Sequence, residues 1–401
     1  MELFKLIINV LELVLFGYLG LTVLYLLFFS LVGFFSKKEL TNVKSEIRKV
    51  AVLIPGYKED SVIIDVAEKA LLQDYPKEKF EIVIIADSFA EQTLAKLRKL
   101  PLTIVEVSFE VSTKAKALNK AMAVIGNNYD VALVLDADNI MEPDFISKIN
   151  NAFNKGFQIV QGHRIAKNVN NSFAILDAIS EEINNYIFRK AHRSIGLSSA
   201  LIGSGMAFDY ALFRDSMKGI DAIGGFDKQL EMYYLKNNYT IEYIDDAIVK
   251  DEKVQKSEVF ANQRRRWLSA QFIYFGENIF SAFQHLLVKG NVDYFDKVIQ
   301  MGQLPRIILL GLVGIITSIY TLLFLFIPEN IFVTDVFSWA VMLVAISLAL
   351  LLSVPPKFFN KDTFNALLTL PKGFLLMVIS MLKFKGANKK FIHTQHGEIE
   401  S

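Results

Sequence analysis

Asp136 and Asp138 stand at the end of an apolar run, residues 131–135, in a segment with the pattern of a buried strand over 130–138. Side chains alternate along a strand, so both carboxylates are expected on the same face. Two neighbouring carboxylates repel each other unless a cation joins them, and a hard divalent ion held together with a substrate diphosphate resolves that repulsion. The pattern predicts a Mg²⁺ or Mn²⁺ site at these two residues. The simpler interpretation is that they cap a strand and start a turn.

A second group of polar residues lies in the sequence QRRRW, which ends at Trp267. Gln263, Arg266 and Trp267 have the spacing i, i+3 and i+4, so one helix presents all three on one face. That face can hydrogen-bond a hydroxyl, bind a diphosphate through the guanidinium fork and stack an aromatic ring on a sugar. Arg264 and Arg265 are expected to point elsewhere, toward anionic lipid head groups. A basic helix with one anchoring Trp at a membrane boundary is the alternative.

The segments that would position these residues alternate between strands and helices. Continuous apolar runs rich in β-branched residues predict a parallel sheet with helices on both faces, and hence an α/β fold. Ligands of such sheets bind at the carboxyl ends of the strands, where Pro55, Asp87 and the two aspartates fall. The strands are expected at 51–55, 80–87, 102–107, 130–138 and 157–162, and the helices at 61–72, 113–125, 143–155, 172–195, 228–237 and 258–275.

The apolar residues, which make up 52% of the 401-residue chain, concentrate at its two ends. Residues 3–35 carry only Lys5 and Glu12 as charges and are long enough to cross a bilayer, so a retained transmembrane helix is expected over 1–36. Basic residues follow this segment, and by the positive-inside rule they place the next part of the chain in the cytoplasm. These residues are Lys37, Lys38, Lys44, Arg48 and Lys49.

The last part of the chain, residues 276–401, is expected to associate with the membrane and to end in a cytoplasmic tail. The sequence therefore predicts an integral protein of the inner or plasma membrane whose middle part, 48–275, is cytoplasmic. Pro371 and Lys372 interrupt the last apolar segment, which favours an interfacial or re-entrant helix there. The expected segments are an interfacial helix over 276–300, spans over about 307–327 and 336–354, and the interrupted helix over 367–382.

Composition excludes several kinds of protein. The 43 basic and 42 acidic residues nearly balance, so no overall field would attract nucleic acid. Without cysteine the chain has no disulfide, no thiolate nucleophile and no zinc–thiolate site. His393 and His396 could share a helix face as metal ligands, but no third ligand stands near them in the sequence.

The order of the motifs resembles that of the family 2 glycosyltransferases. A DxD sequence at a strand end precedes QRRRW, which in turn precedes the apolar C-terminal segments. The resemblance is closest to the membrane-integrated branch that includes cellulose, chitin and hyaluronan synthases and ceramide glucosyltransferase. It implies a nucleotide-diphospho-sugar transferase (GT-A-like) domain over 48–275, with a mostly parallel central sheet flanked by transmembrane and interfacial helices. Further matching segments are IPGYKED (54–60), IIADS (84–88), STKAKALNKAM (112–122), VQGHR (160–164) and GSGMAF (203–208).

The resemblance also implies roles for residues that match the motifs. The donor would be a nucleotide diphosphate sugar, with a UDP-sugar the first expectation. Lys114 and Lys116 could instead lie on a solvated helix face, and Glu59 could be a residue favoured by the dipole of a helix start. Donor contacts are implied for Pro55, Tyr57, Glu59, Asp87, Lys114, Lys116 and Asp136, and diphosphate or acceptor contacts for Gly205, Met206, Gln263, Arg266 and Trp267.

One position departs from the family pattern. The family places a Thr-Glu-Asp triplet after its Gly-Gly segment, and that aspartate removes the proton from the acceptor hydroxyl. The matching residues here are Leu230, Glu231 and Met232, so a methionine stands where the aspartate is expected. Glu231 is our first expectation for the base and Asp227 the second, while the loss of any base stays open.

The expected reaction is inverting transfer of a hexose or N-acetylhexosamine to a growing polysaccharide or a lipid on the cytoplasmic face. Single-sugar transfer to a membrane lipid is one alternative. A nucleotide-binding pseudoenzyme that acts as a scaffold in a polysaccharide export complex is another, which Met232 keeps open. Membrane lipid is an expected partner, nucleic acid is not, and a homo-oligomer is left open. Asp251 and Glu252 border the loop before QRRRW, where a structural role is as well supported as a catalytic one.

Overall fold

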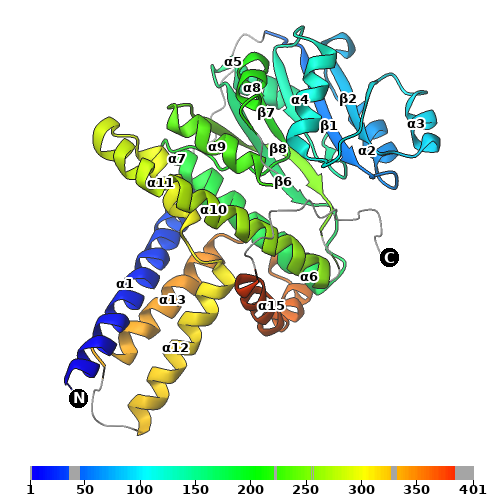
Figure 1. Ribbon diagram of the computed structural model, residues 1–401. Helices are drawn as coiled ribbons and strands as arrows, with labels where there is room; N and C mark the ends of the chain where they lie inside the picture. The colour runs from blue at the N-terminus through cyan, green and yellow to red at the C-terminus, as the bar shows by residue number, and fades with distance from the viewer. Residues whose placement is uncertain are drawn as a thin grey trace.

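The computed structural model describes residues 2–35, 46–220, 224–253, 255, 257–326 and 332–383. A layered α/β domain lies above a group of long helices that run away from it (Figure 1). The eight strands form one sheet in the order β3-β2-β1-β4-β7-β6-β8-β5. The strands are β1 (Val50–Tyr57), β2 (Phe80–Asp87), β3 (Thr103–Val107), β4 (Val131–Val134), β5 (Ile140–Met141), β6 (Ile159–Ala166), β7 (Met206–Asp209) and β8 (Ile241–Asp251).

One half of the sheet is parallel, as the sequence predicts, and the other half is mixed. Strands β3, β2, β1 and β4 pair in parallel, whereas β7 runs antiparallel to both β4 and β6. Strand β8 pairs in parallel with β6, and the short β5 lies antiparallel to β8. The expected "mostly parallel" sheet is thus corrected to a mixed one. Gly203 and Gly205, at φ +82° and +62°, adopt the left-handed conformation in the turn that leads into β7.

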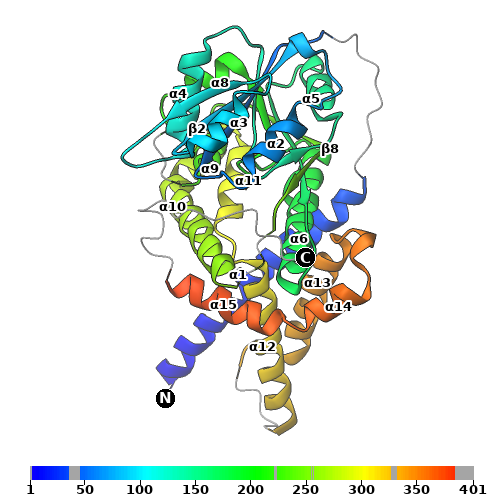
Figure 2. The same cartoon turned by 90° about the vertical axis from the view of Figure 1, so that its right-hand side faces the viewer.

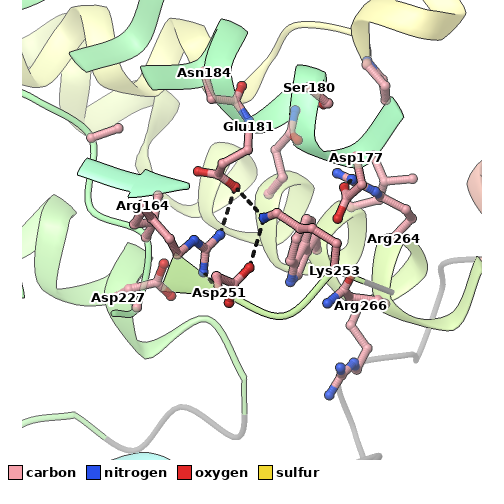
Figure 3. Close-up of a pocket in the computed structure, with 18 of the residues that line it drawn as sticks. Arg164, Asp177, Ser180, Glu181, Asn184, Asp227, Asp251, Lys253, Arg264 and Arg266 are labelled. Carbon is pink, nitrogen blue, oxygen red and sulfur yellow. Dashed lines mark hydrogen bonds and ion pairs between the residues drawn. The ribbon is translucent and has the colours of Figure 1, made fainter. Parts of the chain in front are cut away.

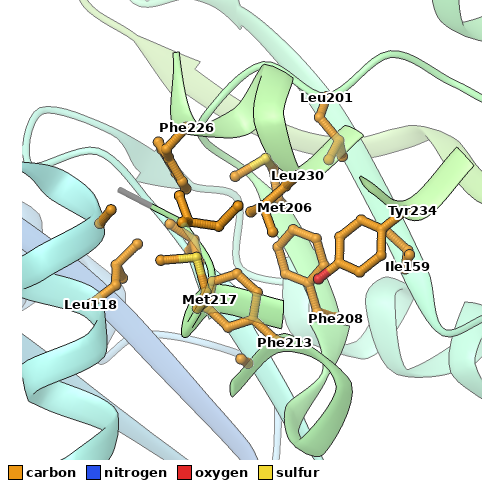
Figure 4. Close-up of a cluster of buried hydrophobic side chains, with 14 of the residues drawn as sticks. Leu118, Ile159, Leu201, Met206, Phe208, Phe213, Met217, Phe226, Leu230 and Tyr234 are labelled. Carbon is orange, nitrogen blue, oxygen red and sulfur yellow. The ribbon is translucent and has the colours of Figure 1, made fainter. Parts of the chain in front are cut away.

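Helices cover both faces of the sheet, and each face has its own apolar core. On one face, Leu118, Phe213 and Leu230 come from three different helices and pack on strand residues such as Leu53 and Phe208 (Figure 4). On the other face, Ile63 and Ile149 pack against Val52 and its neighbours. The covering helices are α2 (Ile63–Ala70), α3 (Glu91–Leu97), α4 (Lys114–Ile125), α5 (Phe145–Asn154), α8 (Tyr210–Met217) and α9 (Phe226–Lys236).

Several element boundaries differ from the predicted ones. The strand expected over 130–138 ends at Val134, so both aspartates follow it in a loop. The helix expected over 172–195 is α6 (Ser172–Asn185), a π-helical segment Tyr186–Ala191 and the short α7 (His192–Ser194). The boundary drawn at residue 275 falls inside one long helix, α10 (Ser257–Lys289), which α11 (Val292–Met301) follows.

Two described helices are long and apolar enough to cross a membrane. They are Leu3–Phe35, which overlaps α1 (Glu2–Val32), and α12 (Arg306–Phe326). The apolar α13 (Val336–Leu352) is shorter and packs against both. Helices α14 (Lys361–Leu367) and α15 (Leu370–Leu382) meet at a bend of 48°, and only together are they long and apolar enough to cross a membrane. This bend is where an interrupted helix was predicted.

The charged residue inside α1 has a structural explanation. Glu12 accepts hydrogen bonds from the hydroxyl of Tyr320 on α12 and from the backbone N–H groups of Val333 and Thr334, just before α13. It therefore ties together the three helices that run away from the sheet (Figure 2). Some of the predicted features lie outside the described residues. They are the basic residues Lys37, Lys38 and Lys44 and the tail that contains His393 and His396.

Candidate active site

A cavity of about 1040 Å³ opens where the carboxyl ends of β1, β2 and β4 face helices α6, α9 and α10. It continues beneath the sheet domain to α12, α13, α14 and α15. Most of the residues singled out from the sequence line this one cavity. They are Pro55, Tyr57, Glu59, Asp87, Lys114, Asp136, Asp138, Asp227, Glu231, Gln263, Arg266 and Trp267.

Three predicted site residues lie outside the cavity. The ammonium of Lys116 donates to the carbonyl of Val111, 3.0 Å away. The carbonyl of Gly205 accepts from the N–H of Gly162 within the sheet, and Met206 is fully buried in the core around Phe208. The structure therefore does not bring these three together with the other predicted residues, and their contact with a ligand stays a prediction. Gly205 and Met206 instead shape the start of β7.

The two aspartates reach the cavity from a loop and not by strand alternation. The N–H of Asp136 donates to the hydroxyl of Ser204 at 2.9 Å, and its carboxylate forms an ion pair with Lys114. Asp138 is buried, and its two oxygens accept from the side-chain amide of Asn139 at 3.1 Å and from the N–H of Glu252 at 3.2 Å. These contacts orient both carboxylates at the cavity wall.

The residues present are compatible with a divalent cation. Asp136 and Asp138 supply carboxylate oxygens, which are the ligands that Mg²⁺ and Mn²⁺ prefer. No cluster of three or more His, Cys, Asp or Glu with metal-site geometry occurs within the described ranges. A cation there would therefore need further oxygen ligands from a bound diphosphate and from water.

The donor end of the cavity lies at the ends of β1 and β2. Asp87 is buried, and one of its carboxylate oxygens accepts from the hydroxyl of Ser88 at 3.0 Å. Lys58 and Ser88 directly follow the two strands and have φ values of 56° and 61°. Non-glycine residues in this left-handed region are uncommon and cluster at ligand sites. The sequence carried no signal for this paired backbone feature.

The two candidate bases have different surroundings. Both oxygens of Glu231 are engaged, one by the N–H of Leu201 at 3.0 Å and the other by the ammonium of Lys228 at 2.9 Å. The carboxylate of Asp227 lies 3.9 Å from the point that a Cβ on Gly203 would occupy. The carbonyl of Gly203 accepts from Lys114, the partner of Asp136, so Asp227 is adjacent to the donor end.

Burial raises the pKa of the Asp227 carboxyl above its ordinary value, although Lys228 and Lys114 oppose that shift. A raised pKa suits a group that must take up a proton near neutral pH. Met232 is buried in the apolar core and does not line the cavity. The geometry therefore favours Asp227 over Glu231 as the group that can accept a proton, which reverses the order expected from the sequence.

A network of buried charges forms the wall between the aspartates and helix α6 (Figure 3). Arg164 donates to Glu181 at 2.8 Å and lies 3.9 Å from Asp251, which accepts from Lys253 at 2.8 Å. The amide of Asn139 connects Asp251 to Asp138. The network therefore orients the second aspartate of the DxD sequence through Asn139. Except for Asp251, the sequence did not single out these charged residues as site residues.

The members of this network stay ionised. Burial alone would raise the pKa of Glu181, but Arg164, Lys253 and Arg189 outweigh burial and hold its pKa well below the ordinary value. Burial likewise opposes the charge of Asp251, and Arg164 and Lys253 again lower its pKa. These groups therefore form structural ion pairs, which suits the positioning of a substrate.

Replacing Glu181 with Gln is expected to lower the free energy of unfolding by about 3 kcal/mol, because it leaves buried cations without their anion. The effect should be full at neutral pH, since a lowered pKa adds stability above the ordinary Glu pKa that is lost only as pH falls through the lowered one. Thermal unfolding of the full chain in detergent measures it. The exposed pair of Glu106 and Arg98 supplies the control: Glu106→Gln should change stability by less than about 1 kcal/mol. An equal effect of the two substitutions would contradict this account.

The QRRRW helix face also differs in one respect from the prediction. Gln263, Arg266 and Trp267 line the cavity as expected, and Arg264 lines it too. Arg264 forms an ion pair with Asp177 on α6, and its guanidinium lies 4.6 Å from the centre of the Trp267 ring. The expected orientation of Arg264 toward lipid is therefore wrong. The reason is that α6 packs beside α10 and offers a buried carboxylate.

The chain belongs to a family of glycosyltransferases. The sequence model of the family described as "Glycosyltransferase like family 2" matches residues 48–270, which is more than half of the chain. The protein named Probable glycosyltransferase YdaM from Bacillus subtilis (strain 168) is 32% identical over 108 residues. That match covers 25% of this chain and 25% of YdaM, so the chain spans a quarter of this relative's length.

A solved structure of a mannosyltransferase shows the same kind of fold. Mannosyltransferase PcManGT from Pyrobaculum calidifontis, solved with GDP-Man and Mn²⁺, has a TM-score of 0.52 at 18% identity over 83% of this chain and 96% of that chain. TarS 1–349 of S. aureus, solved with UDP-GlcNAc, has a TM-score of 0.38 at 18% identity over 56% and 66%. The likeness to PcManGT identifies the mixed sheet as GT-A-like, and the family model identifies the protein as a family 2 glycosyltransferase.

Proposed function

We propose that this protein transfers a sugar, a hexose or an N-acetylhexosamine, from a nucleotide diphosphate donor to an acceptor at a membrane surface, with inversion at the anomeric carbon. The observation that carries the proposal is the shared cavity. One space contains the DxD carboxylates, the Gln-Arg-Trp face of α10 and an apolar end beside the helices that can cross a membrane. A soluble acceptor would not need that third component.

The donor would bind at the ends of β1, β2 and β4. Tyr57 and Asp87 would contact the nucleoside, and Lys114 the diphosphate. Asp136 and Asp138 would hold a Mg²⁺ or Mn²⁺ ion, which when bound neutralises charge on the leaving diphosphate. The presence of Mn²⁺ in PcManGT, which has the same fold, supports the choice of cation. Arg266 would add a guanidinium on the opposite side of the diphosphate.

The acceptor would be a hydroxyl on a lipid or a growing polysaccharide. Its oxygen forms a bond to the anomeric carbon, the bond from that carbon to the diphosphate breaks, and the electron pair leaves with the nucleotide diphosphate. Asp227 takes the hydroxyl proton. Glu231 acts as a positioning residue through its contacts with Leu201 and Lys228. Trp267, which is 42% exposed, offers a stacking surface for the sugar.

The test is transfer of radiolabelled sugar from a panel of UDP- and GDP-sugars to lipid and polymer fractions of membranes that contain the full chain. We expect product with at least one donor, a loss of roughly 100-fold or more in EDTA, and recovery with Mg²⁺ or Mn²⁺. Transfer that EDTA does not affect would contradict the metal assignment. Donor binding without transfer from any donor would instead favour the pseudoenzyme that scaffolds an export complex.

A further inference from the structure

The lower part of the cavity is an apolar channel that leads away from the aspartates. Its walls include Leu310 on α12, Leu350 and Leu351 on α13, Val354 just after α13, and Phe358 and Leu367 near α14. Helix α15 packs on both α10 and α12, and α14 packs on α6. Residues of these helices line the channel, and the helices lie where the sheet domain meets the long helices (Figure 2). A hydrocarbon chain fits such a lining, whereas a polysaccharide would leave its hydroxyl groups without partners.

Arg306 lies at the boundary between the polar and apolar parts of the cavity. It is the first residue of α12, and its Nη2 donates to the carbonyl and hydroxyl oxygens of Ser180 at 3.0 and 3.1 Å. Its Nη1 is buried and has no hydrogen-bond partner among the described residues. Within the same ranges no carboxylate lies at ion-pair distance from it. A buried guanidinium with only neutral partners is unfavourable unless an anion binds beside it.

The surrounding charges do not supply that anion. Glu181 already pairs with Arg164 at 2.8 Å and Arg189 at 3.4 Å, and Asp177 pairs with Arg264. The two carboxylates of α6 that flank Ser180 in the sequence, Asp177 and Glu181, are therefore both engaged by other basic residues. Arg306 shares this wall of the cavity with them but forms an ion pair with neither.

The donor diphosphate is not the missing anion, because it belongs at the other end of the network. A chain of contacts runs from Asp138 through Asn139 to Asp251, and from there through Arg164 to Glu181. Ser180, which directly precedes Glu181 in the sequence, accepts a hydrogen bond from Arg306. Arg306 therefore faces a second anionic position, at the entrance of the apolar channel and separate from the pair of Asp136 and Lys114.

We propose that the acceptor is an anionic lipid whose phosphate binds Arg306 and whose hydrocarbon chain lies in the channel lined by Leu310, Leu350 and Val354. This inference rests on the sugar transfer proposed above and names the class of its acceptor. The planar guanidinium matches two phosphate oxygens, and its free Nη1 supplies the second donor. The phosphate acts as an anchor, so the sugar still joins a hydroxyl of the same lipid and Asp227 still takes the proton.

The experiment measures binding to the full chain in micelles of a neutral detergent with three probes: hexadecyl phosphate, hexadecanol and inorganic phosphate. Wild type should bind hexadecyl phosphate about tenfold or more tightly than hexadecanol, since a charge-assisted hydrogen bond is lost with the alcohol. Inorganic phosphate should bind weakly, because it has no chain for the channel. Arg306→Gln should abolish the preference for the phosphate. Leu350→Trp, which fills the channel, should weaken the binding of hexadecyl phosphate and leave the binding of inorganic phosphate unchanged.

Lys357→Gln is the matched control, because this basic residue adjoins the channel but pairs with Glu182 and does not line the cavity. It should keep the full preference. Equal binding of hexadecyl phosphate and hexadecanol by wild type, or an unchanged preference in Arg306→Gln, would overturn the inference. In the same preparations, sugar transfer from the donor panel reports on the proposed function. If sugar transfer occurs but Arg306→Gln changes neither the transfer nor the lipid preference, this inference is refuted and the proposed function stands. Arg306-dependent lipid binding without transfer from any donor refutes the transferase proposal.

Discussion

Asp138→Asn is expected to reduce sugar transfer by roughly 100-fold or more, because it removes the buried carboxylate that would hold a cation against the leaving diphosphate. The Asn side chain has the same size, so the contact to the N–H of Glu252 can persist and the fold should be retained. The measurement is the initial rate of label transfer to the membrane fraction at saturating donor, with Mn²⁺ titrated over a wide range. We expect the variant to need far more Mn²⁺ or to show no recovery.

Asp144→Asn is the control for Asp138→Asn. Asp144 lies directly before α5, where its exposed carboxylate pairs with Lys148 and does not line the cavity. Its substitution should leave both the rate and the Mn²⁺ dependence unchanged. A full rate for Asp138→Asn at the Mn²⁺ concentration that saturates wild type would show that Asp138 does not hold the cation.

The strands that alternate with helices could be predicted because their apolar runs are continuous. Strands β1 and β2 are largely buried on both faces, so apart from Glu81 near the start of β2 their residues are apolar until the site begins at Pro55 and Asp87. Strand β8 has the opposite character. Its sequence IEYIDDAIVKD alternates apolar with charged residues near the sheet edge and gave no strand prediction. The mixed half of the sheet was therefore missed together with it.

The chemistry of the site was predictable where a motif is local, and was missed where it depends on packing. Two aspartates one residue apart, or Gln263 and Trp267 on one helical turn, can be recognised in the sequence. The ion pairs of Glu181 cannot, because Lys253 comes from a segment far from α6 in the chain and nothing in the sequence shows that Arg164, on the preceding strand, faces the same carboxylate. Only the parallel pairing of β6 with β8 brings those two basic residues to one wall.

The base is the point at which sequence and structure differ most. The sequence offered Glu231 because it is next to Met232, the position where the family has its aspartate. In the fold, Glu231 is 1% exposed and holds the backbone of Leu201, so its carboxylate is committed to structure. Asp227 lies one turn earlier on α9, next to Gly203 and to the carbonyl that Lys114 contacts. Its position beside the donor end, and not its distance from Met232 in the sequence, is the reason that we propose Asp227 as the base.

Asp227→Asn is therefore expected to lower kcat by roughly 100-fold or more while donor binding is retained, as for the loss of a general base. In wild type, kcat/KM should fall as pH drops through the raised pKa of Asp227, because only its carboxylate can accept the proton. Lys228→Gln removes a cation that lowers this pKa, so the acid limb should move to higher pH. Glu231→Gln removes an anion that raises the pKa of Asp227, so the acid limb of the pH profile should move to lower pH. Substantial activity should remain in this variant. The readout is the pH profile of label transfer for the four proteins. If Glu231→Gln lost activity and its acid limb while Asp227→Asn kept both, Glu231 would be the base.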